Sequence, residues 1–335
     1  MRKKYIIGFP HPPQKEGGPG SFQKRIEKEL INLGFIIRYS GDNVKFDLII
    51  VIGGTKKLWW LLKNKLIGVK IIHRLDGINW LHKKKKYSIK YWLYSELTNW
   101  LVKIIRNYFA DFIIYQSKFS QKVWEAYAKP IPINSTIIYN GVDRKLFKKN
   151  DDLQSRKSLI CVEGNLDYSP YSIQLINILY DELFDLIDFN LYGSFENKIN
   201  LSKLNSGIRY HGYLSQNKLI NVYNNAILLS LDINPACPNS VIEALASGIP
   251  VVGYDTGSLN ELVHPKAGII VSYNDDLWNT ELPDVKPLIK AIKDVIDDWP
   301  NYSLNAHKIS VNKFDINKIA KQYSKIIIKQ LSSNT

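Results

Sequence analysis

The sequence predicts an α/β protein of two doubly wound domains, each a parallel sheet with helices on both faces. The chain has 335 residues, enough for two domains at the usual ~100 to 200 residues each. Short apolar runs typical of buried parallel strands alternate with helical periodicity along the whole sequence. Charge divides in the same way: residues 1–150 carry 29 Lys and Arg but 10 Asp and Glu, and the remainder carries 16 and 21. Two halves of opposite sign indicate domains with different partners.

The first half predicts a domain over residues 1–150 in which strands and helices alternate. Uninterrupted apolar runs indicate strands, and apolar residues recurring every three or four positions indicate helices. The expected strands are 4–9, 34–38, 47–52, 69–73, 111–115 and 135–139. The expected helices are 22–33, 56–66, 87–109 and 117–127. The polar segment 143–157 then predicts a linker.

The second half repeats this pattern and predicts a domain over residues 151–316. The expected strands are 158–163, 187–192, 208–211, 227–231, 250–254 and 268–271. The expected helices are 170–184, 215–225, 239–248 and 286–298, and a last amphipathic helix is expected at about 317–331. Ligands of doubly wound sheets bind outside the carboxyl ends of the strands, so we expect the chemistry in a cleft between the domains.

Composition excludes several classes of protein. The apolar stretch at residues 5–9 is too short for a signal peptide or a spanning helix, and no run of about 18 apolar residues follows. Two cysteines, Cys161 and Cys237, cannot form a disulfide framework or a four-ligand zinc site. The histidines and carboxylates lack metal-ligand spacing. We therefore expect a cytoplasmic protein without a metal or other cofactor, lying at most on a membrane surface.

The most specific segment spans residues 235–252, which predict a loop, a helix and a buried strand. The start of this helix offers the backbone N–H groups of Asn239, Ser240 and Val241, which suit a phosphate or diphosphate. Glu243 lies about one turn further into the helix. Its carboxylate is predicted to accept hydrogen bonds from a ribose diol.

This segment resembles the signature of glycosyltransferase family 4, retaining nucleotide-sugar enzymes with the two-domain GT-B fold. In the family two glutamates stand eight positions apart, and Glu243 occupies the second position. The first position holds Pro235, so its contact with the donor sugar falls to Asp232 or to backbone N–H groups after Cys237. The resemblance also implies that the last helix, within 317–335, returns to an acceptor-binding N-terminal domain, and that residues 151–316 bind the nucleotide sugar.

The resemblance continues in the first half. Gly17 and Gly18 follow the first strand, as does the family's glycine-rich loop beside the donor phosphates, although a plain turn is the alternative. Asp76 follows the fourth strand, where the family has a residue near the reacting sugar, whereas His73 lies inside the strand. We expect Asp76 to orient the reacting groups and Arg74 to pair with phosphate. Capping of a turn is the competing interpretation for Asp76.

Two family cations are missing after the first strand of the second domain. Asn165 and Pro170 stand where the family has an arginine and a lysine for the donor diphosphate. Losing two charge-assisted bonds of ~1.5 to 3 kcal/mol each should weaken donor binding unless Arg74 or Lys15 compensates.

Three other segments match the family less specifically. Gly212 and Tyr213 match the family loop that borders the nucleotide base, although a simple strand-to-helix turn at Gly212 is an equal alternative. His211 is expected to be a satisfied strand-end residue. The segments that begin at Ser117 and at Ile138 are predicted to be structural, the first as a helix cap and the second as a turn at Asn140.

The run from Lys83 to Lys86 is the best candidate surface for an anionic partner. Trp80, Tyr91 and Trp92 flank it, and cations beside aromatic rings suit an anionic membrane surface. The competing interpretation is a solvated loop followed by a helix whose aromatic residues lie in the core, because the helical periodicity continues to Tyr108.

The resemblance implies a transferase that moves a sugar from a nucleotide donor to a glycan or lipid-linked acceptor with retention, in cell-envelope polysaccharide or glycoconjugate synthesis. The family favours UDP as the donor nucleotide. A catalytically weak GT-B homologue that binds a glycan or a partner protein is the alternative. A nucleic-acid-binding protein is the weakest interpretation, because a pI of about 9.4 comes with no nucleic-acid module.

Overall fold

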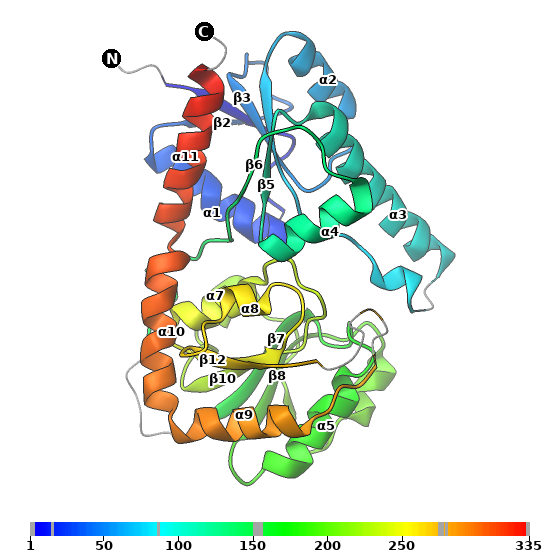
Figure 1. Cartoon of the computed structure of the whole chain (residues 1–335), viewed down its shortest axis with the longest axis vertical. Helices are drawn as coiled ribbons and strands as arrows, with labels where there is room; N and C mark the ends of the chain where they lie inside the picture. The colour runs from blue at the N-terminus through cyan, green and yellow to red at the C-terminus, as the bar shows by residue number, and fades with distance from the viewer. Residues whose placement is uncertain are drawn as a thin grey trace. The chain divides into compact units, whose positions relative to one another are not determined.

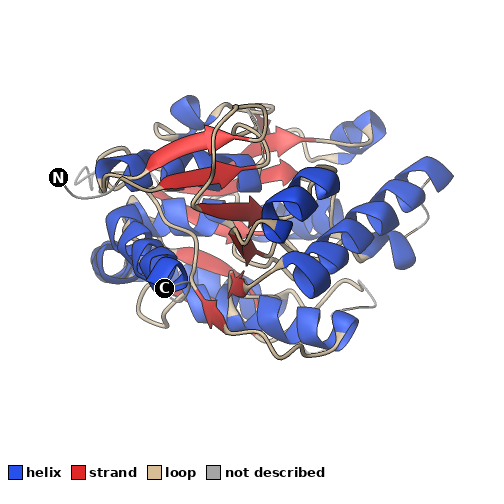
Figure 2. Ribbon diagram, turned by 90° about the horizontal axis from the view of Figure 1, so that it is seen from above, coloured by secondary structure: helices blue, strands red, loops and turns tan. Residues whose placement is uncertain are grey.

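The chain forms two compact units in a computed structural model that describes residues 4–14, 17–85, 88–149, 157–273, 278 and 281–332. Unit 1 comprises Met1–Gly141 and Ile316–Thr335, and unit 2 comprises Val142–Asp315 (Figure 1). Each contains a six-stranded sheet whose neighbouring strands are all parallel. Helices flank the strands (Figure 2). The predicted doubly wound α/β fold class is therefore confirmed.

Unit 1 has the strand order β2-β1-β3-β4-β5-β6. Its strands are β1 (Ile6–Phe9), β2 (Ile36–Tyr39), β3 (Leu48–Ile52), β4 (Lys70–Arg74), β5 (Phe112–Tyr115) and β6 (Ser135–Ile137). Its α-helices are α1 (Gly18–Asn32), α2 (Leu58–Leu66), α3 (Ile89–Ile104), α4 (Lys118–Ala128) and α11 (Ile316–Ser332), with the short turns η1 (Leu81–Lys83) and η2 (Ile105–Phe109). Because β2 and β3 lie on opposite sides of β1, the strand order reverses between β1 and β3, which is where such sheets bind ligands.

The last helix, α11, belongs to unit 1 although nearly the whole chain separates it from α1. The two helices lie side by side (Figure 1), and Phe22 of α1 meets Tyr323 of α11 with ring centroids 5.9 Å apart. The apolar face of α11 joins the unit 1 core through Ile316, Ile319, Ala320, Tyr323 and Ile327. Gly141 is required at the crossing point, because a Cβ there would lie 2.6 Å from Cδ1 of Ile316.

Unit 2 has the strand order β12-β11-β10-β7-β8-β9. Its strands are β7 (Ser158–Asn165), β8 (Asp188–Ser194), β9 (Arg209–Tyr210), β10 (Ala226–Ser230), β11 (Val251–Tyr254) and β12 (Gly268–Val271). Its helices are α5 (Ser172–Leu183), α6 (Gln216–Leu219), α7 (Asn239–Ala246), α8 (Leu259–Leu262), α9 (Lys286–Asp297) and α10 (Trp299–Lys313), with the 3-10 turn η3 (Lys198–Lys203). Its order reverses between β7 and β10.

The structure differs from the sequence predictions in several places. The helix expected at 215–225 is the short α6, and Asn225 beyond it has a positive φ of 47°. The 15-residue helix α10 was not predicted. In the region expected as one helix over 87–109, Trp92 and Tyr108 are 45% and 73% exposed, so the interpretation of these aromatic residues as core is wrong.

Candidate functional site

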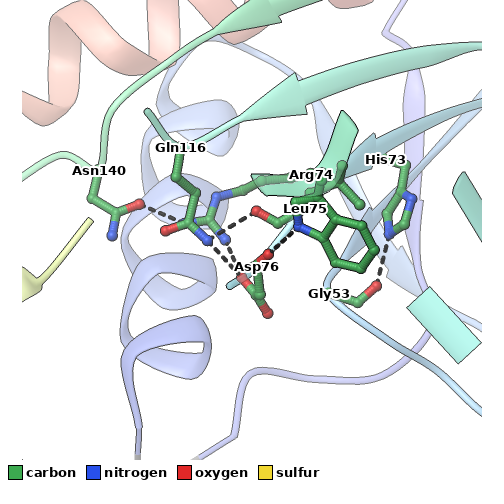
Figure 3. Close-up of polar contacts among 8 residues, drawn as sticks. Gly53, His73, Arg74, Leu75, Asp76, Gln116 and Asn140 are labelled. Carbon is green, nitrogen blue, oxygen red and sulfur yellow. Dashed lines mark hydrogen bonds and ion pairs between the residues drawn. The ribbon is translucent and has the colours of Figure 1, made fainter. Parts of the chain in front are cut away.

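The carboxyl edge of the unit 1 sheet gathers residues from four neighbouring strands (Figure 3). Gly53 follows β3, Asp76 follows β4, Gln116 follows β5 and Asn140 follows β6. Because the strands are parallel, segments 23 or more residues apart in sequence meet at one edge. From the sequence, Asp76 is predicted as a site residue and Asn140 only as a turn, whereas Gly53 and Gln116 are not predicted.

Arg74, the last residue of β4, holds this cluster together. Its Nη1 donates to Oδ1 of Asp76 at 2.6 Å, and its Nη2 donates to Oδ1 of Asn140 at 2.5 Å. The guanidinium also lies 4.0 Å from the centroid of the Phe22 ring, a cation–π contact. Arg74 is 1% exposed, so this geometry favours a positioning role over the predicted contact with phosphate.

Asp76 is fixed through both its backbone and its side chain. Trp124 Nε1 donates to the Asp76 carbonyl at 2.7 Å, and Gln116 Nε2 donates to Oδ1 at 3.0 Å and to the carbonyl of Leu75 at 2.9 Å. Burial raises the pKa of the Asp76 carboxyl, and Arg74 opposes this rise by charge and by hydrogen bonding. A carboxylate held in this way is preorganised to orient a hydroxyl or to receive a proton.

Gly53 has no room for a side chain. Its φ is +61°, a conformation that L-residues avoid, and a Cβ would clash with Oδ2 of Asp76. His73 lies behind the site: its Nε2 donates to the Gly53 carbonyl at 2.8 Å, and the ring is fully buried. Burial lowers the pKa of His73 to about 4, so its imidazole is neutral and supports the Gly53 turn.

The glycine pair occupies the entry to α1. Gly17, with a φ of +89°, precedes the helix, and Gly18 is its first residue. Helix α1 therefore begins four residues before the predicted start at residue 22. The loop follows β1, which borders the reversal of strand order in unit 1.

In unit 2, two carboxyl groups stand on the strands that border the reversal. Glu163 lies near the end of β7, and Asp232 follows β10. Burial raises the pKa of Asp232 to about 6, and burial together with the charge of Asp232 raises that of Glu163 well above its usual value. Oε1 of Glu163 also accepts a bond from the backbone N–H of Leu231 at 3.3 Å. Glu163 is not predicted from the sequence, because no local sequence pattern links it to Asp232.

We expect the Asp232→Asn variant to flatten the dependence of stability on pH. An acid whose pKa rises on folding, here from 3.8 to about 6, binds its proton more tightly in the folded state. Its contribution to the free energy of unfolding is therefore lost as pH rises through that window. We expect a difference of about 1 to 2 kcal/mol between pH 4 and pH 6, measured by urea denaturation.

The matched control is Asp255→Asn, which changes an exposed aspartate after the neighbouring strand β11. It should keep the wild-type pH profile. Equal profiles for wild type and Asp232→Asn would contradict the assignment.

The start of α7 carries the predicted phosphate-binding residues of unit 2. Asn239, Ser240 and Val241 are the first three residues of the helix, and no side chain caps that turn. Asn239 and Ser240 are partly exposed, whereas Val241 is fully buried. Glu243 is 4% exposed, and its Oε2 accepts a bond of 3.4 Å from the hydroxyl of Tyr223.

The remaining unit 2 candidates lie at the same sheet edge. Asn165 ends β7, and its Oδ1 accepts a bond from the N–H of Asp167 at 3.0 Å. Gly212, with a φ of +73°, accepts a bond from the N–H of Gly193, and Tyr213 beside it is 50% exposed. His211 stacks on the ring of Tyr192 with centroids 4.5 Å apart.

Of the remaining predicted residues, Lys15 and Lys86 lie outside the described residues. Cys161 and Cys237 are buried, and neither forms a disulfide. Over the described residues, no three His, Cys, Asp or Glu side chains are grouped to hold a metal ion. Within the same ranges, no helix combines the length and the hydropathy needed to cross a bilayer.

Comparison with known proteins identifies the fold. Residues 171–298 match the family model described as glycosyl transferases group 1. No curated protein matches the sequence. Sucrose-phosphate synthase from Thermosynechococcus elongatus is 14% identical, with a TM-score of 0.75 over 99% of this chain and 100% of that one. Anabaena HepE in complex with UDP is 15% identical, with a TM-score of 0.71 over 98% of this chain and 100% of that one.

A third solved structure is AviGT4, a glycosyltransferase involved in avilamycin A biosynthesis. It is 13% identical, with a TM-score of 0.65 over 98% of both chains. HepE has also been solved with UDP-glucose, at 16% identity and a TM-score of 0.70 over 99% of this chain and 100% of that one. The protein thus has the fold of the GT-B glycosyltransferases over its whole length, which confirms the resemblance at that level.

Proposed function

We propose that the protein transfers a sugar from a nucleotide-sugar donor to a hydroxyl of a glycan or lipid-linked acceptor, with retention of configuration. The observation that carries this proposal is the Asp76 carboxylate, fixed by Arg74 and Gln116 at the carboxyl edge of a sheet in a GT-B fold. Carboxyl groups with a perturbed pKa at a ligand-binding edge are typical of catalytic sites. Membership of family 4 is part of the proposal.

The two units have separate roles in this proposal. Unit 1 binds the acceptor, and Asp76 orients the acceptor hydroxyl toward the sugar carbon. Unit 2 binds the donor: the first turn of α7 receives the diphosphate, and Glu243 holds the ribose. The sugar–phosphate bond breaks as the acceptor oxygen bonds to the same face of the sugar, and the hydroxyl proton passes to the departing phosphate.

UDP is the proposed nucleotide of the donor. HepE, which shares the fold, has been solved with UDP and with UDP-glucose. With Asn165 and Pro170 in place of two cations, we expect the α7 turn to supply most of the interaction with the diphosphate. We place the activity in the cytoplasm, partly on the membrane, within cell-envelope polysaccharide or glycoconjugate synthesis, and expect no metal requirement.

The proposal is tested by a thermal-shift screen of UDP-, GDP-, ADP- and dTDP-sugars without added metal. A ligand present at 100 times its Kd stabilises a protein by ~2.7 kcal/mol, which is readily seen as a rise in Tm. We expect a rise with a UDP-sugar, followed by release of UDP when an acceptor is supplied. Failure of every nucleotide sugar to raise the Tm would overturn the proposal.

We expect Glu243→Gln to weaken UDP binding by ~1.5 to 3 kcal/mol, because a neutral amide replaces a charge-assisted bond to the ribose. Isothermal titration calorimetry with UDP measures this loss. Glu182→Gln, on the exposed side of α5, is the matched control and should bind like wild type. Unchanged affinity in Glu243→Gln would show that the ribose lies elsewhere.

A catalytically weak homologue that binds a glycan or a partner protein is the second candidate. Pro235, Asn165 and Pro170 favour it, because three family side chains are missing from one site. The two candidates separate in a single measurement. A binding protein would bind glycan or UDP without turnover, whereas a transferase would release UDP in proportion to the acceptor consumed.

A further inference from the structure

An ordinary surface helix turns its apolar stripe toward the core, whereas α3 has an apolar stripe that faces solvent. Its outward stripe consists of Ile89, Leu93, Leu97 and Trp100, which follow one another at intervals of four, four and three residues. They are 80%, 57%, 46% and 51% exposed. We call these four residues the apolar face of α3. Monomeric proteins seldom expose a contiguous stripe of this kind without a binding function.

The inward side of α3 buries the polar residues Ser95 and Asn99 together with Val102, and specific hydrogen bonds hold the helix in this orientation. Ser95 and Asn99 are both 2% exposed. Asn99 clamps the chain at Asn79: its Oδ1 accepts from the Asn79 N–H at 2.9 Å, and its Nδ2 donates to the Asn79 carbonyl at 2.7 Å. Arg106, just beyond the helix, is fully buried and donates to the carbonyl of Lys129. Turning the apolar face inward would break these bonds.

A second exposed apolar stripe lies on α2, which packs against η2, the turn that ends α3. It consists of Trp59, Leu62 and Leu66, which are 66%, 36% and 76% exposed. Trp59 also has Lys63 over its ring, with Nζ 5.5 Å from the centroid. Exposed indoles with lysines beside them are typical of the boundary between water and lipid headgroups.

The charge around the apolar face is positive. Lys90 and Lys103 lie on α3 itself, and Lys84 precedes it. The one acidic residue in α3, Glu96, is already engaged: its Oε1 accepts from His82 at 2.6 Å and pairs with Lys83 at 3.0 Å. The surface therefore presents apolar side chains framed by cations.

We propose that this surface docks unit 1 on an anionic lipid bilayer, with the apolar face of α3 inserted among the headgroups. An apolar helix face bordered by lysines is the composition that interfacial helices use, and each lysine near an anionic surface adds attraction. A second copy of the chain fits less well. In a two-fold dimer the same face meets itself, which would bring lysines against lysines. The inference deepens the membrane part of the proposed function and is independent of sugar transfer.

The test is co-sedimentation of the full chain with vesicles of phosphatidylcholine alone or with 30% phosphatidylglycerol. We expect binding to the anionic vesicles, at least tenfold weaker binding to neutral ones, and loss of binding as salt is raised. The triple variant Leu93→Gln, Leu97→Gln, Trp100→Gln should bind anionic vesicles at least tenfold more weakly. Should that variant fold poorly, Trp100→Gln alone should still weaken binding severalfold.

The matched control changes apolar residues of similar exposure in unit 2. Phe184, Leu186 and Ile199 are 49%, 49% and 65% exposed, and their replacement by Gln should leave vesicle binding unchanged. The affinity for UDP, measured on the same preparations, should be unchanged in every variant. If the α3 variants lose vesicle binding but keep UDP binding, the proposed docking surface is supported. If the wild type does not bind UDP, only the proposed function is affected.

Two outcomes would overturn the proposal. One is equal binding of wild type and triple variant to anionic vesicles. The other is that the wild type sediments as a dimer and the triple variant as a monomer, while neither protein binds vesicles.

Discussion

Replacing Arg74 by methionine should lower the free energy of unfolding of unit 1 by about 3 kcal/mol or more. Removing one partner of a buried pair leaves the other charge uncompensated, a loss of ~3 to 5 kcal/mol when both partners are buried. The side chain of Asp76 is 23% exposed, so water screens part of the loss. Oδ1 of Asn140 also loses the hydrogen bond from Arg74.

Urea denaturation followed by tryptophan fluorescence measures this effect, because six of the eight tryptophans belong to unit 1. Arg209→Met is the matched control. The Arg209 side chain is 65% exposed and pairs with Asp188 at 3.7 Å. Such surface pairs contribute at most ~1 kcal/mol. Equal losses in the two variants would show that the Arg74 cluster is not a stabilising element.

Replacing Asp76 by asparagine should lower kcat for sugar transfer by about 100-fold or more while leaving UDP affinity unchanged. Asp76 orients the acceptor hydroxyl, and misplacing a reacting group by ~1 Å can cost about 100-fold in rate. Asparagine keeps the shape, and the backbone carbonyl that Trp124 holds remains. The measurement is UDP release from the nucleotide sugar that gives the largest thermal shift.

Asp111→Asn is the control for this variant. Asp111 precedes β5 at the opposite, amino edge of the same sheet, where its carboxylate accepts from the N–H of Ile71 and pairs with Lys65. Its replacement should alter stability but not kcat. An Asp76→Asn enzyme that keeps its kcat would refute the assigned role of this carboxylate.

The strands were predictable because buried parallel strands are apolar on both faces. Every predicted strand overlaps an observed one, and the boundaries differ by a few residues. Helix α10 was not predicted because its buried residues, Trp299, Ser303, Ala306 and Ser310, have helical spacing but little hydrophobicity. Pro300 also suggests from the sequence that the helix ends after α9, although it lies in the first turn of a new helix.

The outward orientation of the apolar face of α3 could not be predicted from the sequence. Periodicity locates a stripe but does not say whether the stripe faces core or solvent, and here hydrogen bonds made by Asn99 and Arg106 decide the orientation. The candidate site was predictable in part. Asp76 follows an apolar strand and can be found from that position. Gln116, which donates to Asp76, lies 40 residues away, and Asn140, which accepts from Arg74, lies 66 residues from Arg74, so no local pattern links them.

The route of the chain also bears on the order in which the protein is assembled during synthesis. Unit 2 is continuous from Val142 to Asp315, but unit 1 needs α11, which leaves the ribosome after the whole of unit 2. At ~5 to 20 residues per second, roughly 10 to 35 s pass between Gly141 and Ile316. Through that interval the nascent unit 1 lacks the five α11 side chains of its core. Most of unit 1 is therefore made before unit 2 but is completed only after it. During this interval a chaperone can bind the uncovered face of α1.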